Sequence, residues 1–170
     1  RYDGHVWSSV TTLPVTHTLR AVSADAADDA WIVGDSGTTL HWNGTSWTNV
    51  LGAADAFHDL RSVSATGPDD VWIAGSDSSG FASLRHRDVG GWTDVSGFVD
   101  PIDVVLATSP TSVWVGGSTT PLAHFDGTAW SRPTPTGLPG WDTTTGVFAA
   151  ASSPSGHVLF PADGHATARW

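Results

Sequence analysis

The sequence contains no cysteine, methionine, lysine, glutamate or glutamine. Without cysteine the chain forms no disulfide, offers no thiolate to a metal ion and has no cysteine nucleophile. The other four are straight-chain residues that lose little side-chain entropy in a helix, so their absence argues against a helical architecture. The chain is rich instead in glycine, threonine, serine and valine and holds 10 tryptophans, which is typical of strands and turns.

The charged residues are of only two kinds, 7 arginines and 17 aspartates, and they give a net charge of −10. The scattered arginines form no basic stripe that would follow a phosphate backbone, so we expect no nucleic-acid partner. No apolar run reaches the length of about 18 residues that a membrane-spanning helix needs. Phosphate-binding glycine loops are also absent, and we expect no cofactor. The length of 170 residues is enough for one domain.

A repeat of about 40 residues runs through the chain. Its clearest marker is a tryptophan within an apolar run, at positions 31, 72 and 114, which are 41 and 42 residues apart. A degenerate fourth copy covers 147–170, with Val158 at the tryptophan position and Pro161 where Gly34 lies in the first copy. We expect the repeated tryptophans to form the core between neighbouring units, because their strand is apolar throughout.

Each copy contains four short apolar stretches separated by turn residues. The last two stretches are joined by Asn43-Gly44 or Asp126-Gly127, which are strong hairpin signals. Across these hairpins the tryptophans at 47, 92 and 130 face positions 42, 87 and 125. A four-stranded meander with a period of about 40–45 residues is typical of a β-propeller blade. The predicted blades span 18–50, 59–98, 101–134 and 144–170.

The N-terminal segment 1–10 matches the last strand of a copy, since Tyr2-Asp3-Gly4 and Trp7 align with the hairpin that ends at Trp130. The fourth copy lacks that strand. We therefore predict an all-β protein, a single β-propeller domain over 1–170 with four blades of four antiparallel strands, closed by the N-terminal strand that completes the last blade. Such closure removes an exposed sheet edge. The alternatives are half of an eight-bladed ring formed by a dimer, or a fragment of a longer propeller.

The repeat resembles a known group of proteins. The pattern Leu-x-x-Val-x-Ala, Asp-Asp-Val-Trp-x-x-Gly and Leu-His-Trp-Asn-Gly-Thr-x-Trp is similar to the tryptophan-rich propeller repeats of exported bacterial proteins, myxobacterial ones especially, and to Asp-box, kelch and plant photosystem-assembly repeats. The resemblance implies a propeller that is secreted or displayed at the cell surface. Related small propellers include sugar-binding lectins. The chain begins at Arg1 rather than at methionine, which indicates a trimmed or excised domain.

Equivalent positions of the repeat provide the first candidate sites. Arg20, Arg61 and Asp103 share a position on the strand expected to line the channel, and Val147 takes it in the fourth copy. This row of mixed charge could hold water, an anion or a small ligand, or form a salt-bridged plug. Histidines recur at 41, 86 and 124. In a propeller they point away from one another, so we expect hydrogen bonds within each blade and no metal site.

The blade rims provide the candidate ligand-binding residues, which are Trp42, His41, Phe125, His124, Trp141 and Tyr2. Aromatic faces at a rim can stack on sugar rings, and we predict a non-catalytic carbohydrate-binding module. The alternative is a protein–protein interaction or scaffold domain, which an apolar patch around Phe57, Phe81 and Trp141 would favour. We expect no enzyme, because nucleophile motifs and identifiable pairs of catalytic carboxylates are absent.

Overall fold

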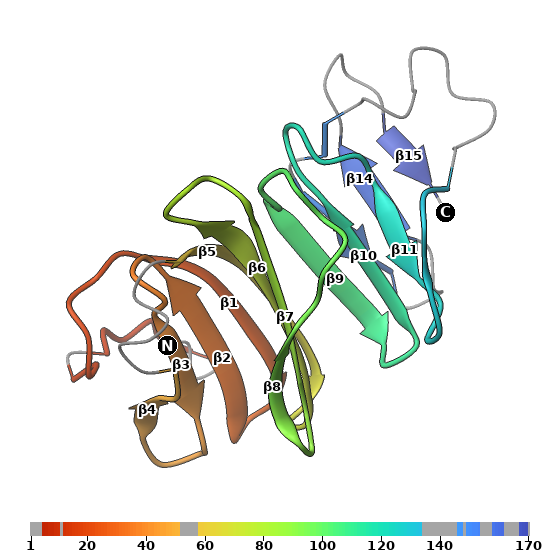
Figure 1. Ribbon diagram of the computed structural model, residues 1–170. Coiled ribbons are helices and arrows are strands. Elements are labelled where there is room, and N and C mark those ends of the chain that lie inside the picture. The colour runs from red at the N-terminus through yellow and green to blue at the C-terminus, as the bar shows by residue number, and fades with distance from the viewer. Residues whose placement is uncertain are drawn as a thin grey trace.

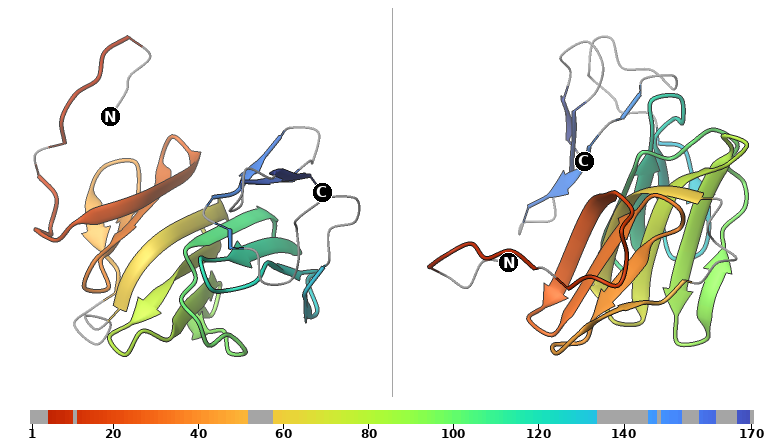
Figure 2. Two further views of the ribbon diagram at one scale, coloured as in Figure 1. Left: turned by 90° about the horizontal axis from the view of Figure 1, so that it is seen from above. Right: turned by 90° about the vertical axis from the view of Figure 1, so that its left-hand side faces the viewer.

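The computed structural model describes residues 5–10, 12–51, 58–133, 146–147, 149–153, 158–161 and 167–169. Every regular element in this part of the chain is a β-strand, and the strands form four antiparallel sheets (Figure 1). The predicted all-β class is therefore confirmed. The sheets follow one another along the chain and stack face to face, as two further views show (Figure 2).

The first two sheets each contain four strands. The first sheet consists of β1 (Leu19–Ala26), β2 (Asp29–Gly34), β3 (Thr39–Trp42) and β4 (Trp47–Asn49). The second consists of β5 (His58–Gly67), β6 (Asp70–Asp77), β7 (Ala82–Asp88) and β8 (Gly91–Asp94). In both, spatial order follows chain order, so each sheet is the meander that the repeat predicts.

The third sheet repeats this plan and the fourth has three described strands. The third consists of β9 (Val104–Ser109), β10 (Ser112–Gly116), β11 (Ala123–Phe125) and β12 (Trp130–Ser131). The fourth consists of β13 (Ala151–Ser152), β14 (Val158–Pro161) and β15 (Thr167–Arg169). In the third sheet the strands become shorter toward the outer edge, so the longer inner strands make most of the packing contacts.

The outer hairpins form where the sequence places them. Asn43 Oδ1 accepts hydrogen bonds from the amides of Thr45 and Ser46 at 3.0 and 2.9 Å, and Asp126 makes the matching pair in the third sheet. Gly44 adopts a φ of +88°, a left-handed conformation that glycine tolerates without steric cost. Across the hairpins the tryptophans at 47, 92 and 130 pair with positions 42, 87 and 125, as predicted.

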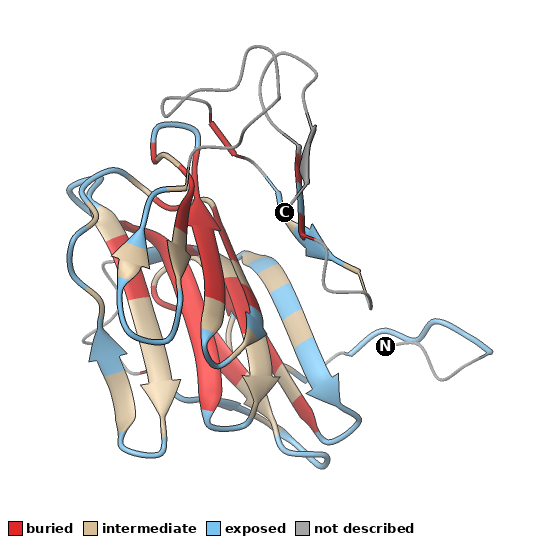
Figure 3. Cartoon of the chain, turned by 90° about the vertical axis from the view of Figure 1, so that its right-hand side faces the viewer, coloured by how far each residue is buried: buried red, intermediate tan, exposed pale blue. Residues whose placement is uncertain are grey.

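The core lies between neighbouring sheets. Trp31, Trp72 and Trp114 are only 1 to 3% exposed, and each packs against the next sheet along the chain. Figure 3 shows the buried residues gathered in the middle of the molecule. Strand β6 is the most completely buried, because it has a sheet on either side. The prediction that these tryptophans form the core between units is confirmed.

Serine hydroxyls join the inner strands of adjacent sheets. Ser23 Oγ accepts a hydrogen bond from the amide of Ala65 at 3.0 Å, and Ser64 Oγ accepts one from the amide of Ala107 at 2.9 Å. Edge amides of an inner strand would otherwise be buried without a partner, at a cost of about 1–3 kcal/mol each. These bonds fix the inner strand of the first sheet against that of the second, and the second against that of the third.

The described sheets form an open arc and not the closed four-bladed ring that the sequence predicted. The first and fourth sheets lie at opposite ends, with the second and third between them (Figures 1 and 2). The described part of the N-terminal segment, 5–10, lies beside the first sheet and away from the fourth in these views. Whether a row of sheets closes into a ring is determined by the angle through which each sheet is turned from the one before it. A ring of four sheets needs twice the angle of a ring of eight.

The fourth repeat begins one residue later than the sequence predicted. The amide of Val147 donates to the carbonyl oxygen of Gly117 at 3.0 Å, as the amide of Ile102 donates to Gly75 at 3.1 Å. Val147 is therefore the equivalent of Ile102 and is fully buried in the core. The prediction that it shares the channel position of Arg20 is wrong by one residue, and that position falls at 148, outside the described residues.

The same shift changes the residue at the tryptophan position. In the third sheet Trp114 pairs with Leu106, four residues after Ile102, and in the fourth sheet Leu159 pairs with Ala151, four residues after Val147. Leu159, and not Val158, therefore takes the tryptophan position, and the residue at the Gly34 position is not Pro161. Because side chains alternate between the two faces of a strand, a slip of one residue moves every side chain to the other face.

Candidate functional site

The predicted channel row consists of paired charges. Arg61 Nη1 lies 2.6 Å from Oδ1 of Asp103, which directly precedes β9, and Arg20 pairs with Asp35, which directly follows β2. Burial raises the pKa of Asp103, but hydrogen bonds from the Ser118 amide and from Arg61 outweigh it and leave the pKa below 3.8. This geometry agrees with the predicted alternative in which the row forms a salt-bridged plug. Whether a ligand binds there stays a prediction.

The repeated histidines make hydrogen bonds within their own sheets, as predicted. His41 and His86 lie 2.7 Å from the carboxylates of Asp29 and Asp70, and each stacks on the tryptophan of its sheet with ring centroids 4.2 and 4.1 Å apart. The acid therefore positions an imidazole that covers the buried indole. Sequence reasoning missed this role of the aspartates. The signal was present, because an aspartate and a histidine recur together in the first two copies, while in the third copy a serine replaces the aspartate and the histidine is kept.

In the third sheet His124 packs on Trp114 and lies 3.1 Å from the Ser112 hydroxyl. Burial lowers its pKa below 6.5, against a smaller opposing effect of Asp126. The folded state therefore binds this proton less readily than the unfolded state, and stability should fall as pH drops from about 6.5 through the lowered pKa.

We expect the loss of unfolding free energy between pH 7.5 and pH 5 to be smaller in the His124→Gln chain than in the wild type. Glutamine keeps a polar group beside Ser112 but has no proton to gain. Urea unfolding of both chains at the two pH values measures the difference. An identical loss in both chains would show that His124 does not contribute to the pH dependence.

The predicted rim residues are largely occupied by packing between strands. His41 and His124 stack on indoles, and Phe125 lies against Trp72 with ring centroids 5.9 Å apart. Trp42 Nε1 donates to the carbonyl oxygen of Ala27 at 3.3 Å. Tyr2, Trp141 and Phe57 lie outside the described residues, while Phe81 is 55% exposed at the β6–β7 turn. The structure brings these residues into no common site among those it describes.

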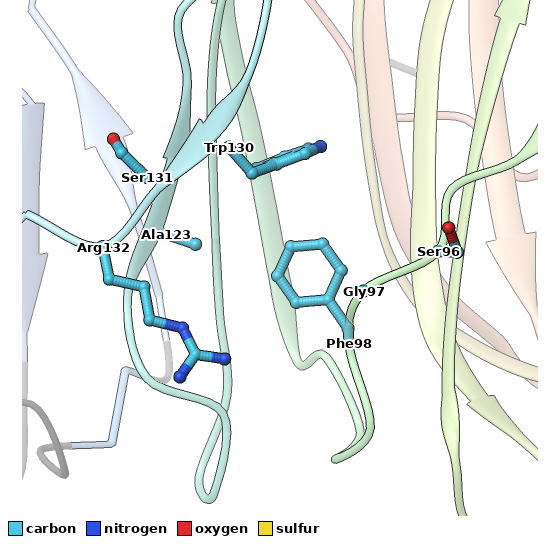
Figure 4. Close-up of a pocket in the computed structure, with 7 residues that line it drawn as sticks. All are labelled: Ser96, Gly97, Phe98, Ala123, Trp130, Ser131 and Arg132. Carbon is cyan, nitrogen blue, oxygen red and sulfur yellow. The ribbon is translucent and has the colours of Figure 1, made fainter.

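A pocket of about 310 Å³ opens between the second and third sheets, at the outer edge of the arc (Figure 4). Phe98 from the connector after β8 and Trp130 from β12 form its apolar wall, with ring centroids 5.1 Å apart and nearly perpendicular. Arg132 extends along the opposite side, and Ser96 and Ser131 add polar groups. A volume near 300 Å³ is at the lower end of small-ligand pockets and suits a single large side chain.

The guanidinium of Arg132 distinguishes this pocket. Four other arginines have described side chains, and all four form ion pairs with aspartates: Arg20, Arg61, Arg85 and Arg87. Arg132 is exposed and has no such partner among the described residues. The sequence offered little indication of this site, because Phe98 and Arg132 follow the last strands of their repeats and belong to none of the motifs that recur. The one sign was that they are bulky or charged residues between turn residues.

Four antiparallel sheets stacked through equivalent tryptophans define a propeller-type repeat protein. No family model and no curated protein matches the chain. Among solved structures, YCF48 bound to D1 peptide is similar with a TM-score of 0.67 at 18% identity, over 93% of this chain and 52% of that one. YCF48 from Cyanidioschyzon merolae is similar with a TM-score of 0.67 at 17% identity, over 94% and 55%.

At these identities the likeness establishes the fold alone. YCF48 is a β-propeller protein, so the predicted propeller repeat is supported, whereas the myxobacterial type and the relation to Asp-box and kelch repeats stay predictions. This chain spans about half the length of the two structures. No helix suited to crossing a membrane occurs in the described ranges, and no group of three or more metal-binding side chains occurs there.

Proposed function

We propose that this chain is a non-catalytic propeller module that binds a peptide segment of another protein in the pocket between its second and third sheets. The observation that carries the proposal is Arg132, which lies beside an apolar pocket and has no ionic partner among the residues that the structure describes. The other four arginines with described side chains form ion pairs within the fold, so among these five Arg132 is the one whose guanidinium can meet a carboxylate of a ligand.

The chemistry of the pocket indicates the ligand class. Phe98 and Trp130 provide an aromatic wall on which an apolar side chain can pack, and Arg132 can bind a carboxylate in a bidentate manner. A peptide with a large apolar side chain next to an acidic residue, or next to a C-terminal carboxylate, meets both requirements. The net charge of −10 opposes long-range attraction of such a peptide, so recognition depends on these short-range contacts.

The comparisons support this function over the predicted carbohydrate binding. One similar structure is of YCF48 bound to D1 peptide, which is a propeller with a peptide ligand. In this chain three of the predicted sugar-binding residues are engaged in packing between strands, namely His41, His124 and Phe125. The proposal includes a location outside the cytoplasm or at the cell surface, which rests on the resemblance of the repeats.

The test begins with selection of random peptides displayed on phage against the immobilised chain. A selected peptide is then synthesised, labelled and titrated by fluorescence anisotropy. We expect Arg132→Ala and Phe98→Ala each to weaken binding at least tenfold, which corresponds to about 1.4 kcal/mol. Arg132→Lys should retain part of the affinity, because lysine keeps the charge but loses the bidentate geometry.

The matched control is Val99→Ala. Val99 follows Phe98 directly, is 65% exposed and does not line the pocket. Binding by this variant should equal that of the wild type, and circular dichroism should show all variants folded. Selected peptides whose affinity is unchanged by both pocket substitutions would overturn the proposal. A glycan array with defined hits that Trp42→Ala removes would establish the carbohydrate-binding prediction instead.

A further inference from the structure

We propose that two copies of this chain join end to end into one closed ring, with the open face of the first sheet packed against the open face of the fourth sheet of the second copy. This assembly is independent of the peptide-binding function. It concerns the two surfaces at the ends of the arc.

The three interfaces within the chain follow one rule. The face of a sheet that carries the tryptophan, here called the tryptophan face, packs on the opposite face of the next sheet, here called the valine face. Trp31 packs with Val63 and Ile73, and Trp72 packs with Val105 and Val115. In these two interfaces the valines are 0 to 7% exposed. Each sheet therefore has two complementary faces, and the chain uses one of each at every internal interface.

None of the described sheets packs against the valine face of the first sheet. Val22, the equivalent of Val63 and Val105, is 68% exposed, in contrast to their 7% and 3%. A hollow of about 910 Å³ lies over this face and is lined by Val22, Ala24, Ile32, Trp42 and Trp47 among others. An apolar sheet face open to water is unfavourable by about 25 cal/mol per Å² relative to the same face covered. Patches of this kind mark interaction surfaces.

The fourth sheet has the complementary surface. Val158 and Phe160 point to the third sheet and are 3% and 1% exposed, as the valine face requires. Leu159 lies on the other face at the tryptophan position and is 45% exposed. The far end of the arc is therefore an open tryptophan face with leucine in place of tryptophan. The two ends are the two halves of the interface that the chain already forms three times.

The curvature of the arc argues against closure of these four sheets on themselves and leaves room for a second copy. The arc superposes with a TM-score of 0.67 on propellers of which it covers 52 and 55%. Its sheets thus follow the curvature of a ring about twice its length. Two arcs related by a twofold axis would place each open end on the other, and a head-to-tail contact that closes gives a finite ring.

The N-terminal segment fits the same arrangement. Its described part, 5–10, lies beside the first sheet, and Trp7 and Val10 line the hollow over the valine face. Trp7 has the repeat position of an outer-strand tryptophan and is 78% exposed. The fourth sheet has three described strands where the others have four. In the dimer, this segment would lie against the fourth sheet of the second copy and supply its outer strand.

The test is the mass of the 170-residue chain in solution, measured by light scattering and by sedimentation over a series of dilutions. We expect twice the 17.7 kDa of one chain. Val22→Asp and Leu159→Asp place a charge at the centre of each open face and should each raise the dimer dissociation constant at least tenfold. The control is Val89→Asp, because Val89 is 89% exposed in the β7–β8 turn and lies on neither face. A monomer at every concentration, or an open polymer, would overturn the proposal.

A crosslinking experiment distinguishes this ring from closure within one chain, even if the aspartate variants fold poorly. Because the chain has no cysteine, single cysteines report one contact each. A Val22→Cys chain mixed with a Leu159→Cys chain should form a covalent heterodimer with a short bismaleimide. A chain carrying both substitutions that gives only an internally linked monomer would show that the two ends meet in one copy, and would overturn the proposal.

Discussion

Replacement of Trp72 by alanine is expected to lower the free energy of unfolding by about 3–5 kcal/mol, as for other fully buried aromatic side chains. The indole is 3% exposed and lies between the second and third sheets, where it contacts His86, Phe125 and Trp130. Its Nε1 also donates to Asp70 Oδ1 at 3.2 Å. Alanine would leave a cavity at the centre of the core and an aspartate with one fewer partner.

Urea unfolding followed by circular dichroism measures this loss. The Trp72→Phe chain should lose clearly less than the alanine chain, because phenylalanine refills much of the volume but cannot donate to the carboxylate. Val89→Ala is the control, since an 89% exposed side chain should change stability by less than about 0.5 kcal/mol. A loss below about 1 kcal/mol in Trp72→Ala would contradict the assignment of this indole to the core.

Gly75→Ala is expected to lower the free energy of unfolding by about 3 kcal/mol, at the upper end of the usual cost of overpacking. A β-carbon at position 75 would lie 2.0 Å from the carbonyl oxygen of Asp59 and 2.8 Å from the α-carbon of Leu60. These are backbone atoms of the paired strand β5, so no side chain can turn away to make room. The strands β5 and β6 would have to separate at the start of their ladder.

The matched control is Gly67→Ala. Gly67 lies at the other end of the same strand pair, and a β-carbon there would have no neighbour within 4 Å. Both substitutions remove the same backbone freedom from the unfolded chain, so the difference between them isolates the steric effect. Equal free energies of unfolding for the two variants would show that β5 and β6 do not approach as closely as the structure has them.

The sequence predicted the features that depend on local chemistry and on repetition. The period of the tryptophans gave the strand order of the first three sheets, and the Asn-Gly and Asp-Gly pairs located the outer hairpins. Each of these follows from a few neighbouring residues whose pattern recurs. The fourth copy was misaligned by one residue because its tryptophan is replaced by Leu159, and without that marker the apolar residues on either side were equally good matches.

Closure and the pocket were harder to predict for a different reason. Whether a row of sheets closes depends on the angle between neighbours, which is set by the sizes of all the packed side chains and not by any motif. The pocket depends on Phe98 and Arg132, which belong to two connectors 34 residues apart and follow no repeat. Only the folded chain shows that these connectors lie side by side.

The serine bonds between inner strands have a consequence for how such a chain changes length. Ser23 binds the amide of Ala65, 42 residues later, and Ser64 binds that of Ala107, 43 residues later. The second repeat thus carries both the amide that binds the preceding unit and the hydroxyl that binds the following one, whereas the third repeat has Leu106 at the serine position. Duplication of the second repeat in the gene would therefore insert a unit whose serine and amide already match those of its neighbours on both sides, so that an array of such units can grow or shrink by whole units without the redesign of an interface.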